Sequence, residues 1–169
     1  READFSRPLF FSVLGLYVRA DDHRFDKDFS LLNMPDIKVA VVDGEMADQI
    51  AGVSFPSASK FSLPQMTNVY DLLMNVDMGK ADFTISGVNE ERLYSQTNPN
   101  KIRRIDAKAP IRTFPNVVMV GKGEQKFLST LNSAFDELDN TGLLNQIISR
   151  YEKTPGEFYR VAKQYEVSQ

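Results

Sequence analysis

The sequence predicts an α/β fold, in which short buried strands alternate with amphipathic helices along 169 residues. Runs of β-branched and apolar residues recur between segments whose apolar residues have helical spacing. This alternation favours βαβ units and a mainly parallel sheet flanked by helices over a sandwich or a helical bundle. A hydrophobic content of 42% and a charged content of 25% are typical of a globular domain.

The expected strands are short and mostly apolar, as strands buried on both faces of a sheet should be. They are residues 14–19, 38–42, 81–86, 101–105 and 117–120. A charged loop is expected at 21–28, a loop rich in Ser, Phe and Pro at 52–64, and an extended connector at 107–115, which carries two prolines.

The helices are predicted from apolar spacing and from residues that favour helix ends. One begins after the turn Asp43-Gly44 and covers 45–51. A second has Thr67 as its N-cap and ends at Gly79. Two more follow at 127–138 and 143–151, and a final short helix is expected from Phe158, Val161, Ala162 and Tyr165.

Composition excludes several function classes. A net charge of −3 without a dense basic patch argues against a nucleic-acid partner. With one histidine and no cysteine, no metal site and no cofactor are expected. The segment around His23 contains Asp21, Asp22, Asp26 and Asp28. Its spacing does not fit a calcium-binding loop, so we interpret it as a solvated loop. No nucleophile or phosphate-loop motif is present, so no catalytic residue is assigned. The apolar run 9–18 is too short to span a bilayer.

Four stretches in order resemble the amino-acid-type solute-binding proteins of ABC transporters. Residues 4–10, Asp-Phe-Ser-Arg-Pro-Leu-Phe, resemble the family's segment before the first crossing strand. Residues 39–51 resemble its strand, turn and helix, and Gly79-Lys80-Ala81-Asp82 resembles its Gly-Arg-x-Asp motif. Residues 117–123, followed by the helical positions up to Tyr151, resemble the return strand and the closing helices.

The resemblance implies the type II periplasmic binding fold, family 3-like, without the N-terminal part of lobe 1. The implied division is a hinge-proximal segment of lobe 1 at 1–10, lobe 2 at 11–114, and the remainder of lobe 1 at 115–169. It further implies a non-enzymatic, exported receptor, periplasmic or extracellular, free or lipid-anchored. Such a receptor would close on a small polar ligand, an amino acid or related carboxylate or amine, and deliver it to a membrane permease.

The turn after the second expected strand is the first candidate ligand site, formed by Val42, Gly44, Glu45 and Met46. The N–H groups that begin a helix can bind an anion without a charged side chain. The alternative is that Asp43 and Glu45 merely satisfy their own helix start.

The second candidate site is the end of the next strand, Ser86 and Gly87, with Asn89 and Glu90 able to add polar contacts. The family places an aspartate for the ligand ammonium at the position of Gly87. Either Glu45 replaces that carboxylate, or the ligand lacks the ammonium. Phe10, Phe11 and Ser12 flank the presumed hinge, and Phe11 and Ser12 complete the set of candidate ligand residues. The aromatic rings there could sandwich a ligand; the alternative is a plain role in the core.

Two other functions share this fold. A dehydratase like the cyclohexadienyl dehydratases would use Glu45 as its acid or base, since burial would raise the pKa of that carboxyl. A ligand-sensing domain of a receptor or sensor kinase is the other. The helices after Gly123 would also expose an apolar face, which predicts homo-association of this chain.

Overall fold

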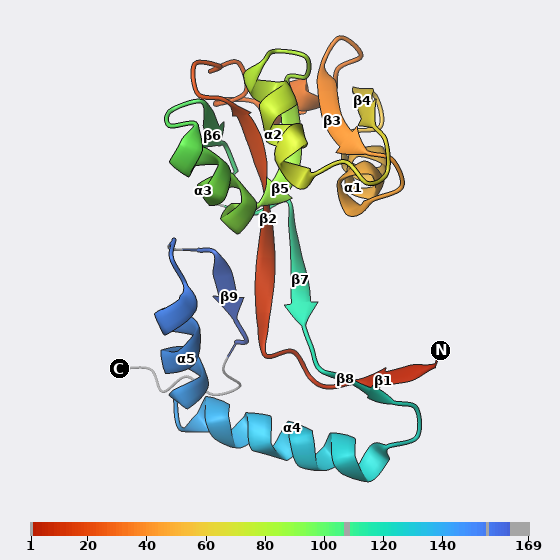
Figure 1. Ribbon diagram of the computed structural model, residues 1–169, viewed down its shortest axis with the longest axis vertical. Helices are drawn as coiled ribbons and strands as arrows, with labels where there is room; N and C mark the ends of the chain where they lie inside the picture. The colour runs from red at the N-terminus through yellow and green to blue at the C-terminus, as the bar shows by residue number, and fades with distance from the viewer. Residues whose placement is uncertain (1, 107–108, 155, 163–169) are drawn as a thin grey trace. The chain divides into compact units, whose positions relative to one another are not determined.

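The computed structural model, drawn in Figure 1, describes residues 2–106, 109–154 and 156–162. It divides into two units, unit 1 (residues 1–13 and 113–169) and unit 2 (Leu14–Arg112), and each is described by itself. The lobe limits expected from the resemblance stay a prediction.

Unit 2 is built on strands in the order β4 (Ser59–Leu63), β3 (Lys38–Val42), β5 (Phe83–Gly87), β2 (Phe10–Arg19) and β6 (Ile102–Arg104). β3 pairs in parallel with β4 and with β5. β2 pairs antiparallel with β5 and β6. The α/β class is therefore confirmed with a parallel centre, and the antiparallel pairings of β2 are an addition to the expected mainly parallel sheet.

Helices pack against the sheet of unit 2. Successive side chains of a strand point to opposite faces of the sheet, so the apolar side chains on a face are buried by the helices that cover it. Ala40 and Val42 of β3 belong to a buried cluster with Leu72, Leu73 and Val76 of α2 (Val69–Asp77). The next helix, α3 (Val88–Thr97), contacts both α2 and β5. Figure 1 shows α2 and α3 side by side.

Phe83 of β5 belongs to a second group of packed side chains. There Phe83 packs edge-on against Phe55, the C-cap of α1 (Met46–Ser54), with ring centroids 5.1 Å apart. A short 3₁₀ helix, Phe29–Asn33, contains one buried side chain, that of Leu32. Both faces of the central strands are therefore packed, which accounts for their apolar sequences.

Unit 1 combines short strands with two helices. β1 (Ala3–Phe5) pairs antiparallel with β8 (Met119–Gly121), and β7 (Arg112–Asn116) and β9 (Phe158–Arg160) pair with β2. α4 (Gln125–Asn140) and α5 (Leu143–Tyr151) are joined at Gly142, whose φ of +74° suits glycine. α5 leaves at a steep angle to α4 (Figure 1).

The side chains of α4 have little cover within the described chain. No residue of α4 is buried, although its apolar residues gather on one face, and Phe127 is 56% exposed. The apolar face expected after Gly123 is therefore seen, and homo-association through it stays a prediction.

In the apolar segments, the strands and helices of the structure lie close to the positions predicted from the sequence. The strand 38–42 is found with the expected limits, and strands at 14–19, 81–86, 101–105 and 117–120 are found with ends shifted by a few residues. The helices predicted at 45–51, 127–138 and 143–151 are present as α1, α4 and α5. The described part of the connector 107–115 includes most of β7, which runs from Arg112 to Asn116.

Two interpretations were wrong because pairing with a neighbouring strand overrode the local pattern. The segment 52–64, expected as a loop, contains α1's end and β4, an edge strand whose Ser59, Lys60 and Ser62 are exposed. The expected final helix starts instead with β9, which pairs with Phe10–Ser12. Its last position, Tyr165, lies outside the described residues.

The N-cap of α2 is Asn68 and not Thr67. The Asn68 side chain accepts a hydrogen bond from Tyr70 N at 3.0 Å, while the Thr67 hydroxyl donates to the Pro64 carbonyl. The end of the helix is as predicted: Gly79 has a φ of +70° and its N–H donates to Val76 O.

This assignment predicts that Asn68→Ala lowers the free energy of unfolding by about 1 kcal/mol, because the N–H of Tyr70 loses its partner. Urea denaturation followed by circular dichroism would measure it. The matched control is Thr67→Ala, for which we expect the smaller loss, since this hydroxyl does not cap the helix. A larger loss for Thr67→Ala would contradict the assignment.

Candidate functional site

The two candidate turns lie at the same edge of the unit 2 sheet. β3 and β5 are parallel neighbours with Val39 opposite Phe83 and Ala40 opposite Thr84. Continued for two residues, this register brings Val42 beside Ser86 at the carboxyl ends of both strands. Because α1 begins directly after β3 and α3 directly after β5, two helix N-termini meet at this edge.

The turn before α1 is open to solvent. Asp43, Gly44, Glu45 and Met46 are all exposed, and Gly44 has a φ of +76°, a conformation that favours glycine. Glu45 is the N-cap but makes no capping hydrogen bond with its side chain. Asp43 and Glu45 therefore do not satisfy the start of α1.

The carboxylate that does bind this turn is Asp48. It accepts the Gly44 N–H at 3.1 Å and the Lys60 ammonium at 2.5 Å. The Lys60 hydrogen bond, and then the Gly44 N–H, hold the pKa of Asp48 below its usual range. The charge near the helix start is thus partly balanced, and the N–H groups of Met46 and Ala47 precede the first intrahelical donor.

The strand end beside this turn carries a serine and a glycine. Ser86 is 3% exposed, and its hydroxyl has no hydrogen-bond partner among the described residues. Gly87 is the N-cap of α3. A Cβ atom at Gly87 would lie 1.9 Å from Glu90 Oε2, so the Glu90 carboxylate occupies the space that a side chain at position 87 would need.

The other polar residue of this turn has a partner of its own. Asn89 accepts a hydrogen bond from Arg92 Nη2 at 2.7 Å. This bond links the first turn of α3 to the next one, so the amide is in use within the helix. Asn89 is half-buried rather than exposed, and a ligand role for it stays a prediction.

A buried polar cluster behind the edge was missed by the sequence analysis. Asp106 is 3% exposed and accepts from Leu16 N, Ile111 N and Arg104 Nε. Arg104 crosses β2 at Gly15, where a Cβ would lie 2.6 Å from Arg104 Nε. The spacing Arg-x-Asp was the available signal, but nothing local shows that the pair is buried.

Phe11 and Ser12, the remaining predicted site residues, lie in unit 1. Ser12 Oγ accepts a hydrogen bond from Asn116 Nδ2 at 2.8 Å, and Phe11 pairs with Tyr159. The structure thus brings together Val42, Gly44, Glu45, Met46, Ser86 and Gly87 within unit 2, whereas a ligand role for Phe11 and Ser12 stays a prediction.

Two aspartates from the motifs that resemble the family, Asp82 and Asp4, accept hydrogen bonds from other segments of the chain. The Asp82 carboxylate accepts from Lys38 N at 2.8 Å and from Arg24 Nη2 at 2.5 Å, which ties β3 to β5. The Asp4 carboxylate accepts from Gly123 N at 3.0 Å and from Gln125 Nε2 at 2.8 Å. Both aspartates therefore join segments that are distant in the chain.

The acidic loop around His23 is an ion-pair network. His23 Nδ1 lies 2.8 Å from Asp26 Oδ2, and Asp26 also pairs with Arg103. Across the described ranges, no three His, Cys, Asp or Glu side chains are grouped so that they could hold a metal ion. The same ranges contain no helix long and apolar enough to cross a membrane.

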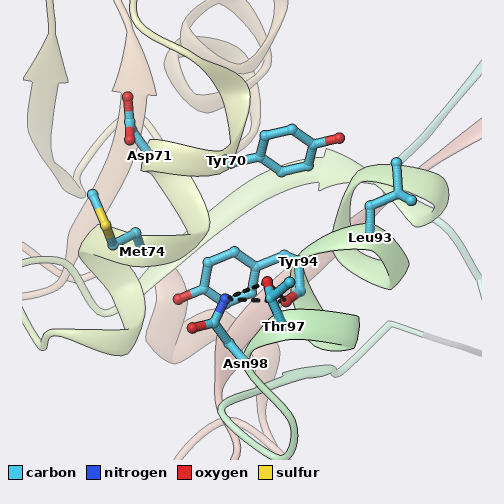
Figure 2. Close-up of a pocket in the computed structure, with 7 residues that line it drawn as sticks. All are labelled: Tyr70, Asp71, Met74, Leu93, Tyr94, Thr97 and Asn98. Atoms are coloured by element: carbon cyan, nitrogen blue, oxygen red, sulfur yellow. Dashed lines mark hydrogen bonds between the residues drawn. The ribbon is translucent and has the colours of Figure 1, made fainter.

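A separate pocket of about 380 Å³ lies between α2 and α3. Figure 2 shows Tyr70, Asp71 and Met74 of α2 on one side and Leu93, Tyr94, Thr97 and Asn98 on the other. Tyr94 Oη donates to Asp77 Oδ2 at 3.1 Å; burial, together with this bond, raises the pKa of Tyr94 to about 12. None of the predicted site residues lines this pocket.

The fold of the chain is that of the amino-acid-binding proteins of ABC transporters. A putative binding component of an ABC transporter from Wolinella succinogenes, complexed with lysine, superposes with a TM-score of 0.72 at 18% identity, covering 90% of this chain and 64% of that one. The ancestral amino-acid-binding protein AncCDT-1, a precursor of cyclohexadienyl dehydratase, gives 0.67 at 22% identity, covering 90% and 62%.

A Streptococcus pneumoniae amino acid ABC transporter substrate-binding protein bound to L-arginine gives a TM-score of 0.64 at 19% identity, covering 88% of this chain and 60% of that one. The chain therefore spans less than two thirds of the length of these proteins. No family model matches the sequence, and no curated protein does. The type II periplasmic binding fold expected from the resemblance is confirmed.

Proposed function

We propose that this chain is part of an extracytoplasmic solute-binding protein that captures a small polar ligand by closing two lobes on it. The observation that carries the proposal is the pairing of β3 with β5, which sets the exposed turn 43–46 beside the strand end at Ser86 and Gly87. Ligands of open α/β sheets bind outside the carboxyl ends of the strands, where helix starts offer free N–H groups.

The chemistry of this edge suits recognition. The α1 start offers N–H donors with no capping side chain, and a ligand carboxylate or carbonyl oxygen would accept from them. A ligand that binds the closed form more tightly shifts the protein toward closure, and a membrane permease would read that form. The proposed ligand is an amino acid or a related amine or carboxylate, in line with the lysine and arginine bound by the solved proteins of this fold.

Met46→Pro tests the α1 start within the full-length protein. Met46 is the first residue of α1 and follows an extended Glu45, so proline is compatible with this position and removes a single N–H donor. We expect affinity for L-lysine, L-arginine or L-glutamine, measured by calorimetry, to fall about tenfold or more, since a hydrogen bond to a charged group is lost.

The matched control is Val69→Pro, the same change at the first residue of α2, which follows an extended Asn68. It should leave affinity unchanged. The proposal would be overturned if the unmodified protein bound none of these ligands saturably. It would also be overturned if affinity were unchanged both in Met46→Pro and in variants substituted at Gly44.

An enzymatic reading is favoured by one observation, the likeness to AncCDT-1, a precursor of cyclohexadienyl dehydratase. In that reading Glu45 would be the acid or base. Glu45 is exposed within unit 2, so the burial that would prepare its carboxyl for proton transfer is not seen there. Turnover of prephenate or arogenate that disappears in Glu45→Gln would establish the enzyme and displace the receptor.

A further inference from the structure

The pocket between α2 and α3, which we call the α2–α3 pocket, has the size and the walls of a small-molecule site. Its volume of about 380 Å³ falls in the range of ligand pockets, roughly 300–1,000 Å³. Tyr70 and Met74 of α2 and Leu93 and Tyr94 of α3 supply its apolar walls. Figure 2 shows the ring of Tyr70 reaching from α2 toward Leu93. A compact apolar group is matched to this space.

The α3 wall of this pocket is held in place by hydrogen bonds. Tyr94 is 7% exposed, and its phenol donates to Asp77 Oδ2 at 3.1 Å. Because burial, and then this bond, raise the pKa of Tyr94 to about 12, the phenol keeps its proton at neutral pH and the bond persists. The Asn98 amide nitrogen donates to Tyr94 O at 3.1 Å and to Thr97 Oγ1 at 3.0 Å. The ring and the amide are therefore already fixed before a ligand binds.

The polar groups that stay free in this pocket can all accept a hydrogen bond. Both N–H bonds of the Asn98 amide are in use, so the group that it still offers is Oδ1. The carboxylate of Asp71 has neither an ion pair nor a hydrogen bond within residues 2–106, 109–154 and 156–162; the Asp71 backbone carbonyl accepts from Asn75 Nδ2. The Tyr70 hydroxyl, which can donate or accept, has no partner in those ranges either. These groups suit a ligand that carries N–H donors.

The charge of the pocket is negative. Asp71 is the one charged residue among the seven that line it, and a second carboxylate, Asp77, accepts from the Tyr94 phenol. The cation of α3, Arg92, bonds to Asn89 and does not line the pocket. Asp71 also belongs to the first turn of α2, where a negative charge stabilises the helix start. That role does not use the hydrogen-bonding capacity of the carboxylate, which remains available to a cation.

We propose that the α2–α3 pocket binds a small organic amine, a protonated ammonium group joined to a compact aromatic or aliphatic body. The ammonium donates a charge-assisted hydrogen bond to the Asp71 carboxylate, and the body packs against Tyr70, Met74 and Leu93. Asn98 Oδ1 accepts from a second donor on the ligand. An acid is disfavoured, because the Asp71 carboxylate repels it. The site does not depend on the proposed function, since no residue of the turn 43–46 and neither Ser86 nor Gly87 lines it.

Calorimetric titration of the full-length protein with phenethylamine tests the site. The comparison ligands are 2-phenylethanol, which has the same ring and chain without the charge, and 3-phenylpropionate, which has a similar shape and the opposite charge. We expect saturable binding of phenethylamine, at least about tenfold tighter than that of either comparison ligand. In ¹H–¹⁵N NMR spectra, phenethylamine should shift the amide signals of residues 70, 71, 93 and 94, which places it in the pocket.

Asp71→Asn keeps the shape of the side chain and removes its charge, so we expect the affinity for phenethylamine to fall about tenfold. Tyr70→Leu removes the ring and should lower it by a few-fold, whereas Tyr70→Phe keeps the ring and should retain it. The matched control is Glu91→Gln. It removes a carboxylate from α3 that bonds to Ser95 and does not line the pocket, and it should leave the affinity unchanged. Thermal melts without ligand show whether each variant is folded.

Equal affinity for phenethylamine and 3-phenylpropionate would overturn the inference, because the Asp71 charge would then select nothing. Unchanged affinity in a folded Asp71→Asn would overturn it as well. So would the absence of saturable phenethylamine binding, or NMR shifts confined to the turn 43–46 and to Ser86 and Gly87. None of these results would affect the proposed receptor function, which is tested with amino acids and with Met46→Pro.

Discussion

Asp106→Ala is expected to lower the free energy of unfolding of unit 2 by about 3–5 kcal/mol. The Asp106 side chain is almost completely buried and accepts three hydrogen bonds, from Arg104 Nε at 2.7 Å, Ile111 N at 2.8 Å and Leu16 N at 3.1 Å. Its removal would leave the Arg104 guanidinium without its ion-pair partner and two N–H groups unpaired. Urea denaturation monitored by circular dichroism would measure the loss.

The matched control is Asp21→Ala, at another Arg-x-Asp pair. Asp21 accepts from Arg19 Nε at 3.2 Å, but its side chain is 81% exposed, and an exposed ion pair contributes about 1 kcal/mol or less. Asp106→Asn should fall between the two, because the amide oxygen keeps one acceptor and the charge is lost. Equal losses for Asp106→Ala and Asp21→Ala would show that burial does not strengthen the Arg104 pair.

Phe83→Ala should be similarly destabilising, by about 3–5 kcal/mol. Phe83 is fully buried at the start of β5 and packs edge-on against Phe55, with an angle of 76° between the rings. Truncation removes this contact and leaves a cavity between the strand and the end of α1, which the close-packed surroundings can fill only in part. The midpoint of urea unfolding should fall accordingly, with an unchanged slope.

Phe29→Ala serves as its control, because Phe29 belongs to the same unit and is 44% exposed. We expect a loss of about 1 kcal/mol or less at this position. A small loss in Phe83→Ala would mean that this face of β5 is not part of the core of unit 2.

Local pattern predicted the elements whose sequences are both apolar and periodic. Lys38–Val42 is found as expected, because four of its five residues are buried and β-branched or small. Gly79 ends α2 as expected, because a positive φ suits glycine. Ser59–Leu63 could not be predicted in the same way, since its exposed serines and lysine become a strand only through pairing with β3.

The candidate site also has features that the local sequence predicted and features that it did not. The turn 43–46 was found from the order of strand, glycine and helix, and Gly87 was identified as a position without the expected carboxylate. That Glu90 occupies the space beside Gly87 follows from the direction in which α3 leaves the strand, which no local pattern encodes. The ion pair of Arg104 and Asp106 was missed for the same reason, since its burial depends on β2 passing at Gly15.

The sequence by itself determined the α/β class, the positions of the apolar strands and helices, and the positions of the turns that follow β3 and β5. These features depend on the spacing of apolar residues and on the backbone freedom of glycine, both of which act within a few residues. Tertiary structure alone decided which strands pair, which carboxylates are buried and which remain without a partner. Those properties depend on residues that are distant in the chain and meet only when the sheet has formed.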